Sequence, residues 1–452
     1  MANLEGVLET LLSELEKYPL TPALSPHAGQ GRNQRLAAAS APAQDGGMNR
    51  LLQDLRIVEI SAFVAAPLGG MTMAQMGAEV IRIDPIGGGI DFARWPVTRD
   101  GASLYWAGLN KAKRSLALAL DKPEGLEIAR AIITAPGPSA GIFLTNLPPS
   151  RGLDFATLQA VRADLVLLRL VGNRDGSAAV DYTVNAASGF PLVTGRGDGP
   201  ANHVLPAWDI TAGLYLAAGL LAAERHRCRT GKGQEVVLAL SDVMLATVGN
   251  LGYIADVQIN GTARPAIGND LYGSFGRDFP TADGHRVMII ALTRRQWRAI
   301  GEATGLGNRL AMIGLMMEVD LDTEAGRYEA RDMIGALLAR WCASRSLDEV
   351  RRAFAGTGVL WGQFQDFAQL VRDDPRCSET NPLFAAVEQP GIGRYLMPGL
   401  PLDFSAEARL PARPAPLLGE HTDIVLSEVL GLSSAEIGRL HDHRIVAGPD
   451  GR

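Results

Sequence analysis

From residue 55 onwards, the chain alternates short apolar segments of strand character with longer segments of helical periodicity. The first repeat reads LRIVEIS, PLGGMTMAQMG and AEVIRID over residues 55–84. A strand, a helix and a second strand in this order form a βαβ unit, which has parallel strands joined by a right-handed crossover. Further strand-like segments follow at 115–120, 140–146 and 163–172, with helical segments between them. We therefore predict an α/β fold with a Rossmann-like open parallel sheet.

The first turn between strand and helix reads SAFVAAPLGG and lacks the G-x-G-x-x-G pattern that a pyrophosphate-binding turn requires. The fold class therefore does not predict dinucleotide binding here. Between about residues 264 and 360 the pattern changes to hairpin-like strands followed by helices, which predicts a smaller central α+β domain. We expect the first part of the large domain to span 48–250, and residues 1–47 to be a disordered extension because they lack periodicity.

Composition excludes several classes of function. The formal net charge is −6, so the chain offers no general electrostatic attraction to nucleic acid or to an anionic membrane. Three scattered cysteines, Cys228, Cys342 and Cys377, fit a reducing cytoplasm and have no metal-ligand spacing, so we expect no metal. The longest apolar run, residues 210–223, is shorter than the roughly 20 residues of a membrane span and predicts a buried helix.

Asp209 stands between a tryptophan and that apolar helical run. A structural interpretation is an N-cap, in which the side chain accepts hydrogen bonds from the free N–H groups of the helix start. A functional interpretation is a nucleophilic carboxylate that attacks an acyl group, kept ionised by the same helix end and poorly hydrated beside Trp208. The two interpretations are compatible, because an N-cap can also direct an oxygen into a pocket.

Other polar residues lie where open α/β sheets bind their ligands. Asn146 follows a predicted parallel strand, and the block NKAKRS, which contains Lys113, precedes another one. Such a basic block is more often a solvated surface than a phosphate site. His203 and His421 have no partner spaced for metal binding, so a structural role is the simpler interpretation of each.

Together these segments resemble the family III CoA-transferases, also called the CaiB/BaiF family. The resemblance depends on LRIVEISAFVAAPLGGMTMAQMGAEVIRID, NKAKRSLAL, TNL, AWDITAGLYLAAGLLAAERHRCRTGKGQ and PAPLLGEHTDIVL, in this order. It implies that Asp209 carries the acyl group and then CoA. It also implies that residues 375–452 return to the large domain, that two subunits interlock as a homodimer, and that no cofactor is needed beyond the CoA of the substrate.

The same resemblance implies the location of the CoA cleft. Asn146, Arg151 and Lys113 are expected to contact CoA, and the backbone N–H groups near Val64 and Ala65 to stabilise the oxyanion. The related racemases of this fold place a histidine immediately before an aspartate in an earlier loop. That position is Val180 here, and valine cannot exchange a proton, so racemisation is disfavoured.

A narrower resemblance covers RWPVTRDG, VDYTVN, NHVLPAWDI, LYGSFGRDF and EQPGIGRYLMPG. Within the family it implies transfer of CoA between the two carboxyls of one mesaconate, in the 3-hydroxypropionate route of carbon assimilation. His203, Asn185, Tyr272 and Arg277 are the candidate contacts of the freed mesaconate. Two alternatives remain open: an intermolecular transferase with a dicarboxylic acid acceptor, and a CoA-binding protein without catalytic activity.

Overall fold

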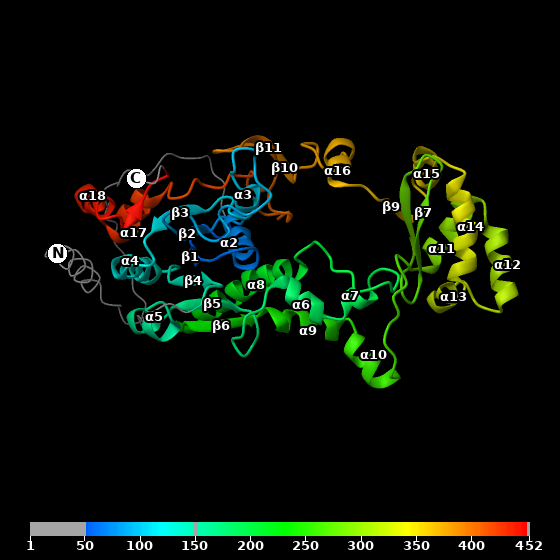
Figure 1. The fold of residues 1–452 in the computed structure, drawn as a ribbon, viewed down its shortest axis with the longest axis horizontal. Coiled ribbons are helices and arrows are strands. Elements are labelled where there is room, and N and C mark those ends of the chain that lie inside the picture. The colour runs from blue at the N-terminus through cyan, green and yellow to red at the C-terminus, as the bar shows by residue number, and fades with distance from the viewer. Residues whose placement is uncertain (1–50, 149–151, 450–452) are drawn as a thin grey trace, which may run out of the picture. The chain divides into compact units, whose positions relative to one another are not determined.

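The computed structural model describes residues 51–148 and 152–449 (Figure 1). The expected extension over residues 1–47 and the candidate Arg151 lie outside the described residues. The chain divides into two compact units. The first contains the described residues up to Val184, then Leu205–Thr247, and the chain from Ser378 onwards; the second contains Asn185–Val204 and Val248–Cys377.

The first unit is built on a seven-stranded sheet with the order β12-β3-β2-β1-β4-β5-β6. Neighbouring strands from β1 to β6 pair in parallel, and β12 pairs antiparallel with β3. The strands are β1 (Arg56–Ile60), β2 (Glu79–Pro85), β3 (Arg114–Leu118), β4 (Ile142–Thr145), β5 (Val166–Val171), β6 (Gln234–Ala239) and β12 (Val446–Ala447). The order of β1 to β6 is that of a Rossmann sheet, which confirms the predicted fold class.

Helices cover both faces of this sheet. One face carries α2 (Ala65–Gln75) and α8 (Ala207–Thr230), which pack against each other and the strands. The opposite face carries α4 (Pro123–Thr134), α5 (Phe155–Val161), α17 (Thr422–Leu430) and α18 (Ser434–Asp442). The red C-terminal helices lie beside β3 and α4, so the end of the chain completes the large unit (Figure 1).

The alternation of side chains along β1 explains the two faces. Val58 and Ile60 point into the apolar core shared with α4, α5 and α17, whereas Glu59 between them points toward Gly70 of α2. Shorter elements complete the unit, namely α3 (Leu104–Leu109), α6 (Asp181–Ala187), α9 (Leu240–Asn250) and the hairpin of β10 (Phe384–Gln389) and β11 (Gly393–Pro398). The start of α6 belongs to the first unit.

The second unit contains an antiparallel sheet of β7 (Phe275–Pro280), β8 (Arg286–Ala291) and β9 (Leu360–Gln363). Its helices are α7 (Phe190–Val193), α10 (Tyr253–Asn260), α11 (Arg294–Thr304), α12 (Gly307–Met317), α13 (Glu324–Glu329), α14 (Arg331–Ala343), α15 (Leu347–Phe354) and α16 (Phe367–Asp373). Capping boxes at Thr293 and Ser346 fix the starts of α11 and α15. This unit extends beyond the span 264–360 expected from sequence, because residues 185–204, 248–263 and 361–377 also group with it.

The long helix α8 is only partly buried, whereas a buried helix was expected over residues 210–223. One side is buried, through Ala212, Leu216 and Leu220, while Leu214 and Tyr215 are 53% and 52% exposed. None of the described helices is long and apolar enough to cross a membrane.

The crossing of α2 and α8 depends on two glycines. A Cβ on Gly213 would lie 2.7 Å from the backbone oxygen of Ala65, and one on Gly69 would lie 3.1 Å from that of Gly213. Only glycine permits helix backbones to approach this closely. Gly213 lies one turn after Asp209, so the same crossing brings the first turn of α8 to the start of α2.

Candidate active site at the first turn of helix α8

Asp209 is the third residue of α8 and lies within its first turn. The helix N-cap is Pro206, which has no side-chain capping bond, so the N-cap interpretation of Asp209 was wrong. The carboxylate that caps this helix is Asp181, at the first position of α6. Its Oδ2 accepts the N–H groups of Trp208 at 2.8 Å and of Asp209 at 3.1 Å. The N–H groups at this helix end therefore donate to the carboxylate of Asp181 and not to that of Asp209.

The environment of Asp209 makes its carboxylate harder to ionise. Burial and the nearby charge of Asp181 raise the pKa of Asp209 to about 6, and the guanidinium of Arg94 acts in the opposite direction. In the described part of the chain the Asp209 carboxylate accepts no hydrogen bond and forms no ion pair. The expectation that helix N–H groups hold it ionised was therefore wrong. A partly desolvated carboxylate without donors has its lone pairs available for attack.

Asn146 lies at the point where the strand order of the sheet reverses, between β1 and β4. Its Oδ1 accepts the N–H of Ala62 at 2.9 Å, and its Nδ2 donates to the Ala62 oxygen at 2.7 Å. This paired contact joins the loops that follow β1 and β4 at the carboxyl edge of the sheet. Ligands of open α/β sheets bind at such a switch point. In the structure Asn146 positions the loop after β1, a role that sequence alone did not suggest.

The loop after β1 is held in a strained conformation. Phe63 has a φ of 66°, in the left-handed region that a side chain other than glycine rarely adopts. Its N–H donates to Oδ2 of Asp91 at 2.9 Å. Asp91 and Asn146 therefore hold this loop from two sides, immediately before the first turn of α2. Strain of this kind is common where a loop must present its backbone to a ligand.

The N–H groups that follow Phe63 are not used by the backbone hydrogen bonds of the described residues. Helix α2 begins at Ala65, and its N-cap Val64 makes no side-chain capping bond. Within residues 51–148 and 152–449, no acceptor pairs with the N–H groups of Val64, Ala65 or Ala66. Free N–H groups at a helix start attract negative charge. Val64 and Ala65 thus lie at the start of the helix that crosses α8 at Gly213, and their role as oxyanion contacts stays a prediction.

Lys113 is placed differently from the expected CoA contact. Its side chain is 0% exposed, and Nζ donates to Glu59 at 2.8 Å, to the Pro67 oxygen at 2.9 Å and to Asn110 at 2.9 Å. These three acceptors account for every donor of the ammonium group. A contact with a CoA phosphate would break this set, so the structure assigns Lys113 to the support of β1 and α2.

Arg82 is the centre of the same buried ionic network. It bonds Asp84 at 2.8 Å, Glu59 at 3.3 Å and the Ser61 oxygen at 3.0 Å, and it lies 3.5 Å from Asp91. Arg82 is 1% exposed. Buried charges persist in proteins when they are paired and hydrogen-bonded as here. The network reaches the active-site loop through Asp91, which holds the N–H of Phe63.

Arg94 is a cation near Asp209 that sequence reasoning missed. Its guanidinium carbon lies 5.2 Å from the ring centroids of both Phe63 and Tyr105, and the residue is exposed. No carboxylate in the described residues pairs with it. Burial raises the pKa of Tyr105 to about 12; the charge of Arg94 lowers this pKa and that of Asp209 raises it, so Tyr105 lies close to both. An arginine held by two rings and free of carboxylates is suited to bind one from a substrate.

The four candidate substrate contacts, His203, Asn185, Tyr272 and Arg277, all belong to the second unit. Arg277 forms ion pairs with Asp270 and Asp332. Its charge is therefore already neutralised within this unit.

The other three candidates have these surroundings. Asn185 is fully buried and donates to Asn202. Tyr272 packs edge-on against Tyr328, with the guanidinium of Arg264 4.8 Å from its ring. His203 is half-buried. Their roles as mesaconate contacts stay predictions.

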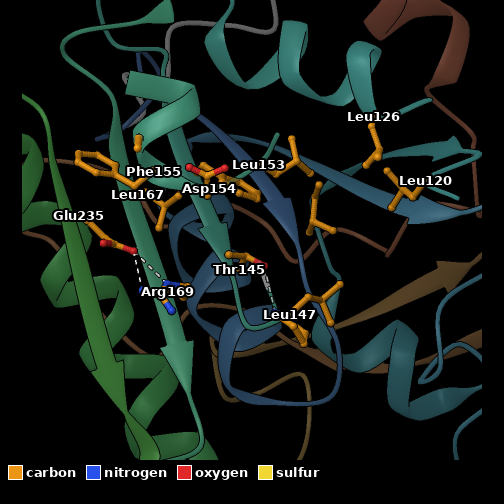
Figure 2. A pocket seen from close by; sticks show the side chains of 14 residues that line it. Leu120, Leu126, Thr145, Leu147, Leu153, Asp154, Phe155, Leu167, Arg169 and Glu235 are labelled. Carbon is orange, nitrogen blue, oxygen red and sulfur yellow. Dashed lines mark hydrogen bonds and ion pairs between the residues drawn. The ribbon is translucent and has the colours of Figure 1, made fainter. Parts of the chain in front are cut away.

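A cavity of about 430 Å³ lies on the other face of the sheet, beneath α4 and α5 (Figure 2). Its walls are mostly apolar, and Arg169 pairs with Glu235 at 2.8 Å on one side. Leu147, the neighbour of Asn146, lines it, but Asp209, Phe63 and Arg94 do not. The cavity therefore does not contain the group that would react.

The fold agrees with the results of comparison with known proteins. A model of the CoA-transferase family III matches residues 52–422. The chain belongs to this family, as the sequence motifs predicted, and the protein is an enzyme of the CoA-transferase class.

Individual relatives narrow the comparison. The chain is 57% identical over 406 residues to 2-methylfumaryl-CoA isomerase from Chloroflexus aurantiacus, which covers 89% of this chain and 99% of the relative. It is 28% identical to succinyl-CoA:mesaconate CoA-transferase from Haloarcula marismortui, over 83% of this chain and 96% of that one. A crystal structure of a CaiB/BaiF family protein from Brucella suis has a TM-score of 0.69 at 23% identity, covering 85% and 100% of the two chains. That likeness concerns the fold alone.

Proposed function

We propose that this protein moves CoA between the C1 and C4 carboxyls of one mesaconate molecule, which is the isomerisation of 2-methylfumaryl-CoA. The observation that carries the proposal is the state of Asp209, a partly buried carboxylate with a pKa raised to about 6. Among the described residues it has no hydrogen-bond donor, and the nearby cation Arg94 has no carboxylate partner. The 57% identity with an enzyme of that name supports the choice of substrate.

The proposed reaction begins with attack of an Asp209 oxygen on the C1 thioester carbonyl. The new C–O bond gives a mixed anhydride, and the C–S bond breaks to release CoA thiolate. The thiolate then attacks the aspartyl carbonyl carbon. The bond between that carbon and the bridging oxygen of the anhydride breaks, and its electron pair leaves with the C1 carboxylate of mesaconate. The products of this half-reaction are an aspartyl-CoA thioester and the mesaconate dianion.

The second half-reaction reverses these steps at the other carboxyl. The C4 carboxylate attacks the aspartyl thioester, thiolate leaves, and the thiolate attacks the C4 carbonyl of the new anhydride. Asp209 returns as a carboxylate, and no proton or electron is gained or lost overall. One oxygen atom passes from the C4 carboxylate to Asp209 in each turnover, and one passes from Asp209 to C1.

Two features of the site support these steps. Negative charge develops on the thioester oxygen during attack, and the N–H groups of Val64 and Ala65 provide donors for it. The freed mesaconate carries two charges and must stay in the site until it presents C4. Arg94 provides a counter-charge for one carboxylate. Arg151 stays a predicted CoA contact. The proposal also includes a homodimer, with the CoA-bearing substrate as the sole small-molecule partner.

The test is to incubate the purified enzyme with mesaconyl-C1-CoA that carries 18O in its free C4 carboxylate. We expect conversion to the C4 isomer without any added acid, and a 2 Da increase in the peptide that contains Asp209 after one turnover. A requirement for a second dicarboxylic acid would replace the proposal with intermolecular transfer, the activity of the 28% identical relative. Binding of CoA thioesters with no turnover, unchanged in Asp209→Ala, would indicate a binding protein.

A further inference from the structure

The first turn of α8 has an unusual hydrogen-bond pattern. The N–H of Ala207 donates to the Leu205 oxygen at 2.8 Å, and that of Ile210 to the Pro206 oxygen at 3.0 Å. The two N–H groups between them donate to the same atom, Oδ2 of Asp181. Every free donor of this helix start is therefore satisfied. None of them is left for the side chain of Asp209.

Capping helix α8 with the buried carboxylate of Asp181 lowers stability. It is 2% exposed, and its second oxygen, Oδ1, is buried and has no hydrogen-bond partner in the described part of the chain. A serine, threonine or asparagine at position 206 would cap the helix without burying a charge. A buried oxygen without a partner lowers stability, so its presence needs an explanation. Helix capping alone does not supply one.

We propose that Asp181 is the positioning residue of the nucleophile. By holding the N–H groups of Trp208 and Asp209, it fixes the first turn of α8 and leaves both carboxylate oxygens of Asp209 free of helix donors. Its own negative charge keeps those oxygens electron-rich and therefore more nucleophilic. This inference rests on the proposed function, since it concerns the carboxylate that attacks the thioester.

The charges around Asp209 determine how far its pKa is shifted. Asp181 faces it from α6, Arg94 from the loop between β2 and α3, and Tyr105 from α3. Asp181 is the anion among them, and it raises the pKa of Asp209 while Arg94 lowers it. Arg94 remains in place in the variants considered below. A change at residue 181 therefore isolates the anionic contribution.

The experiment compares Asp181→Asn with Asp181→Ala. Asparagine keeps an oxygen that accepts both N–H groups but removes the charge, whereas alanine removes both. The substrate-free measurement is the pH dependence of Asp209 modification by a water-soluble carbodiimide, read by peptide mass spectrometry. In Asp181→Asn we expect the midpoint to fall by about half a pH unit or more, because a neighbouring like charge is lost.

Steady-state rates with mesaconyl-C1-CoA provide the second measurement. We expect kcat to fall about tenfold in Asp181→Asn, with KM within twofold, because the charge acts on the nucleophile and not on substrate binding. In Asp181→Ala the fall should be about a hundredfold, since the first turn of α8 also loses its cap. The melting temperature should drop by a few °C in the alanine variant alone.

The matched control is Asp366, which caps α16 of the second unit through the N–H of Gln369 at 2.7 Å. Asp366→Asn should leave the modification midpoint and kcat unchanged. An Asp181→Asn enzyme that matches the wild type in both midpoint and kcat would overturn the inference. The midpoint is measured without substrate, so an enzyme that isomerises nothing but shows the expected midpoint shift refutes the proposed function and leaves the influence of Asp181 on Asp209 established.

Discussion

The side chain of Asp209 combines two properties that folding alone would not favour. It is partly buried, and the nearest carboxylate increases the free energy of its charged form. A surface aspartate would be easier to ionise but would be a weaker and better hydrated nucleophile. The structure therefore suggests a residue at which stability has been exchanged for reactivity, as is common at active sites.

The pKa of Asp209 predicts opposite effects of pH on activity and on stability. Attack requires the ionised form, so we expect kcat/KM to fall about tenfold per pH unit below about pH 6. The folded-state pKa is higher than the unfolded value, so folding takes up protons and the charged group lowers the free energy of unfolding as pH rises from about 4 to 6.

Asp209→Asn is the variant that checks the stability effect. We expect it to abolish turnover and to raise the free energy of unfolding at pH 8 by about 1–3 kcal/mol, which is a few °C in melting temperature. This gain should shrink as pH falls toward 4, where the wild-type carboxyl is protonated when folded. Urea unfolding of both proteins at pH 4, 6 and 8 measures it. A gain that does not depend on pH would contradict the pKa assignment.

Arg94 is expected to retain the freed mesaconate. Arg94→Gln removes the counter-charge and should increase the release of free mesaconate per turnover at least about tenfold, because the dianion loses a charge-assisted contact. The measurement is the escape of 14C-mesaconate from labelled substrate. Arg99→Gln removes the same charge from an exposed position of the same loop and serves as the control. Equal escape from the two variants would remove Arg94 from the site.

Sequence reasoning selected Asp209 and Asn146 as candidates but did not predict their local contacts. Asp209 was selected because a carboxylate precedes a long apolar helix, and Asn146 because it follows a strand. The contact of Asp181 with α8 spans 28 residues of sequence, and the position of Arg94 depends on rings from two other segments. Contacts of this kind follow from tertiary packing, so local pattern carries no signal for them.

At the scale of elements, the site depends on how α2 and α8 cross. Helix α2 presents the free N–H groups of Val64 and Ala65, and α8 presents Asp209. Gly213 lets the backbones approach at the level of Ala65. The two helices touch one turn below Asp209, which keeps the local geometry fixed. In the proposed mechanism, this crossing sets the distance between the nucleophile and the oxyanion donors.

Gly213→Ala tests this element. The new methyl group would lie 2.7 Å from the Ala65 oxygen, so the helices must separate. We expect a loss of about 1–3 kcal/mol in the free energy of unfolding and a fall in kcat of about tenfold or more. Gly219→Ala is the matched control on the same helix, because its methyl group would lie 3.7 Å from the nearest atom, Cδ2 of Leu168. That variant should gain stability from helix propensity and keep its activity.

The elements that sequence predicted were those with a strong period. The βαβ units of the large unit appeared as expected, because apolar strands and amphipathic helices have distinct periods. The hairpin β10–β11 was not predicted, since Gly391 and Gly393 interrupt the strand pattern. The two residues of β12 are too few for any period. Helices α13 and α14 meet at Ala330, a boundary without a glycine or proline signal, so sequence pattern alone does not separate them.

At the scale of the whole molecule, the first unit has a surface that its own fold does not cover. The sheet ends at β6, an edge strand, and α8 packs beside it. Leu214, Tyr215 and Leu221 on α8 and Val237 on β6 are each between 37% and 53% exposed. Exposed apolar side chains that gather on adjacent elements are characteristic of protein interfaces. A second copy of the chain is the partner that the family resemblance implies.

We therefore expect the protein to be a homodimer in solution, with this surface buried between subunits. The double variant Leu214→Glu and Leu221→Glu places two charges on the exposed side of α8 and should shift the mass measured by light scattering from about twice the chain mass toward one chain. Val161→Glu alters a side chain of α5 that is 54% exposed and should leave the mass unchanged. Because burial of apolar area drives such association, the double variant of α8 should also lose thermal stability at low protein concentration. A wild type that is monomeric at micromolar concentration would show that the apolar side of α8 tolerates water, and the dimer would then have no support from this surface.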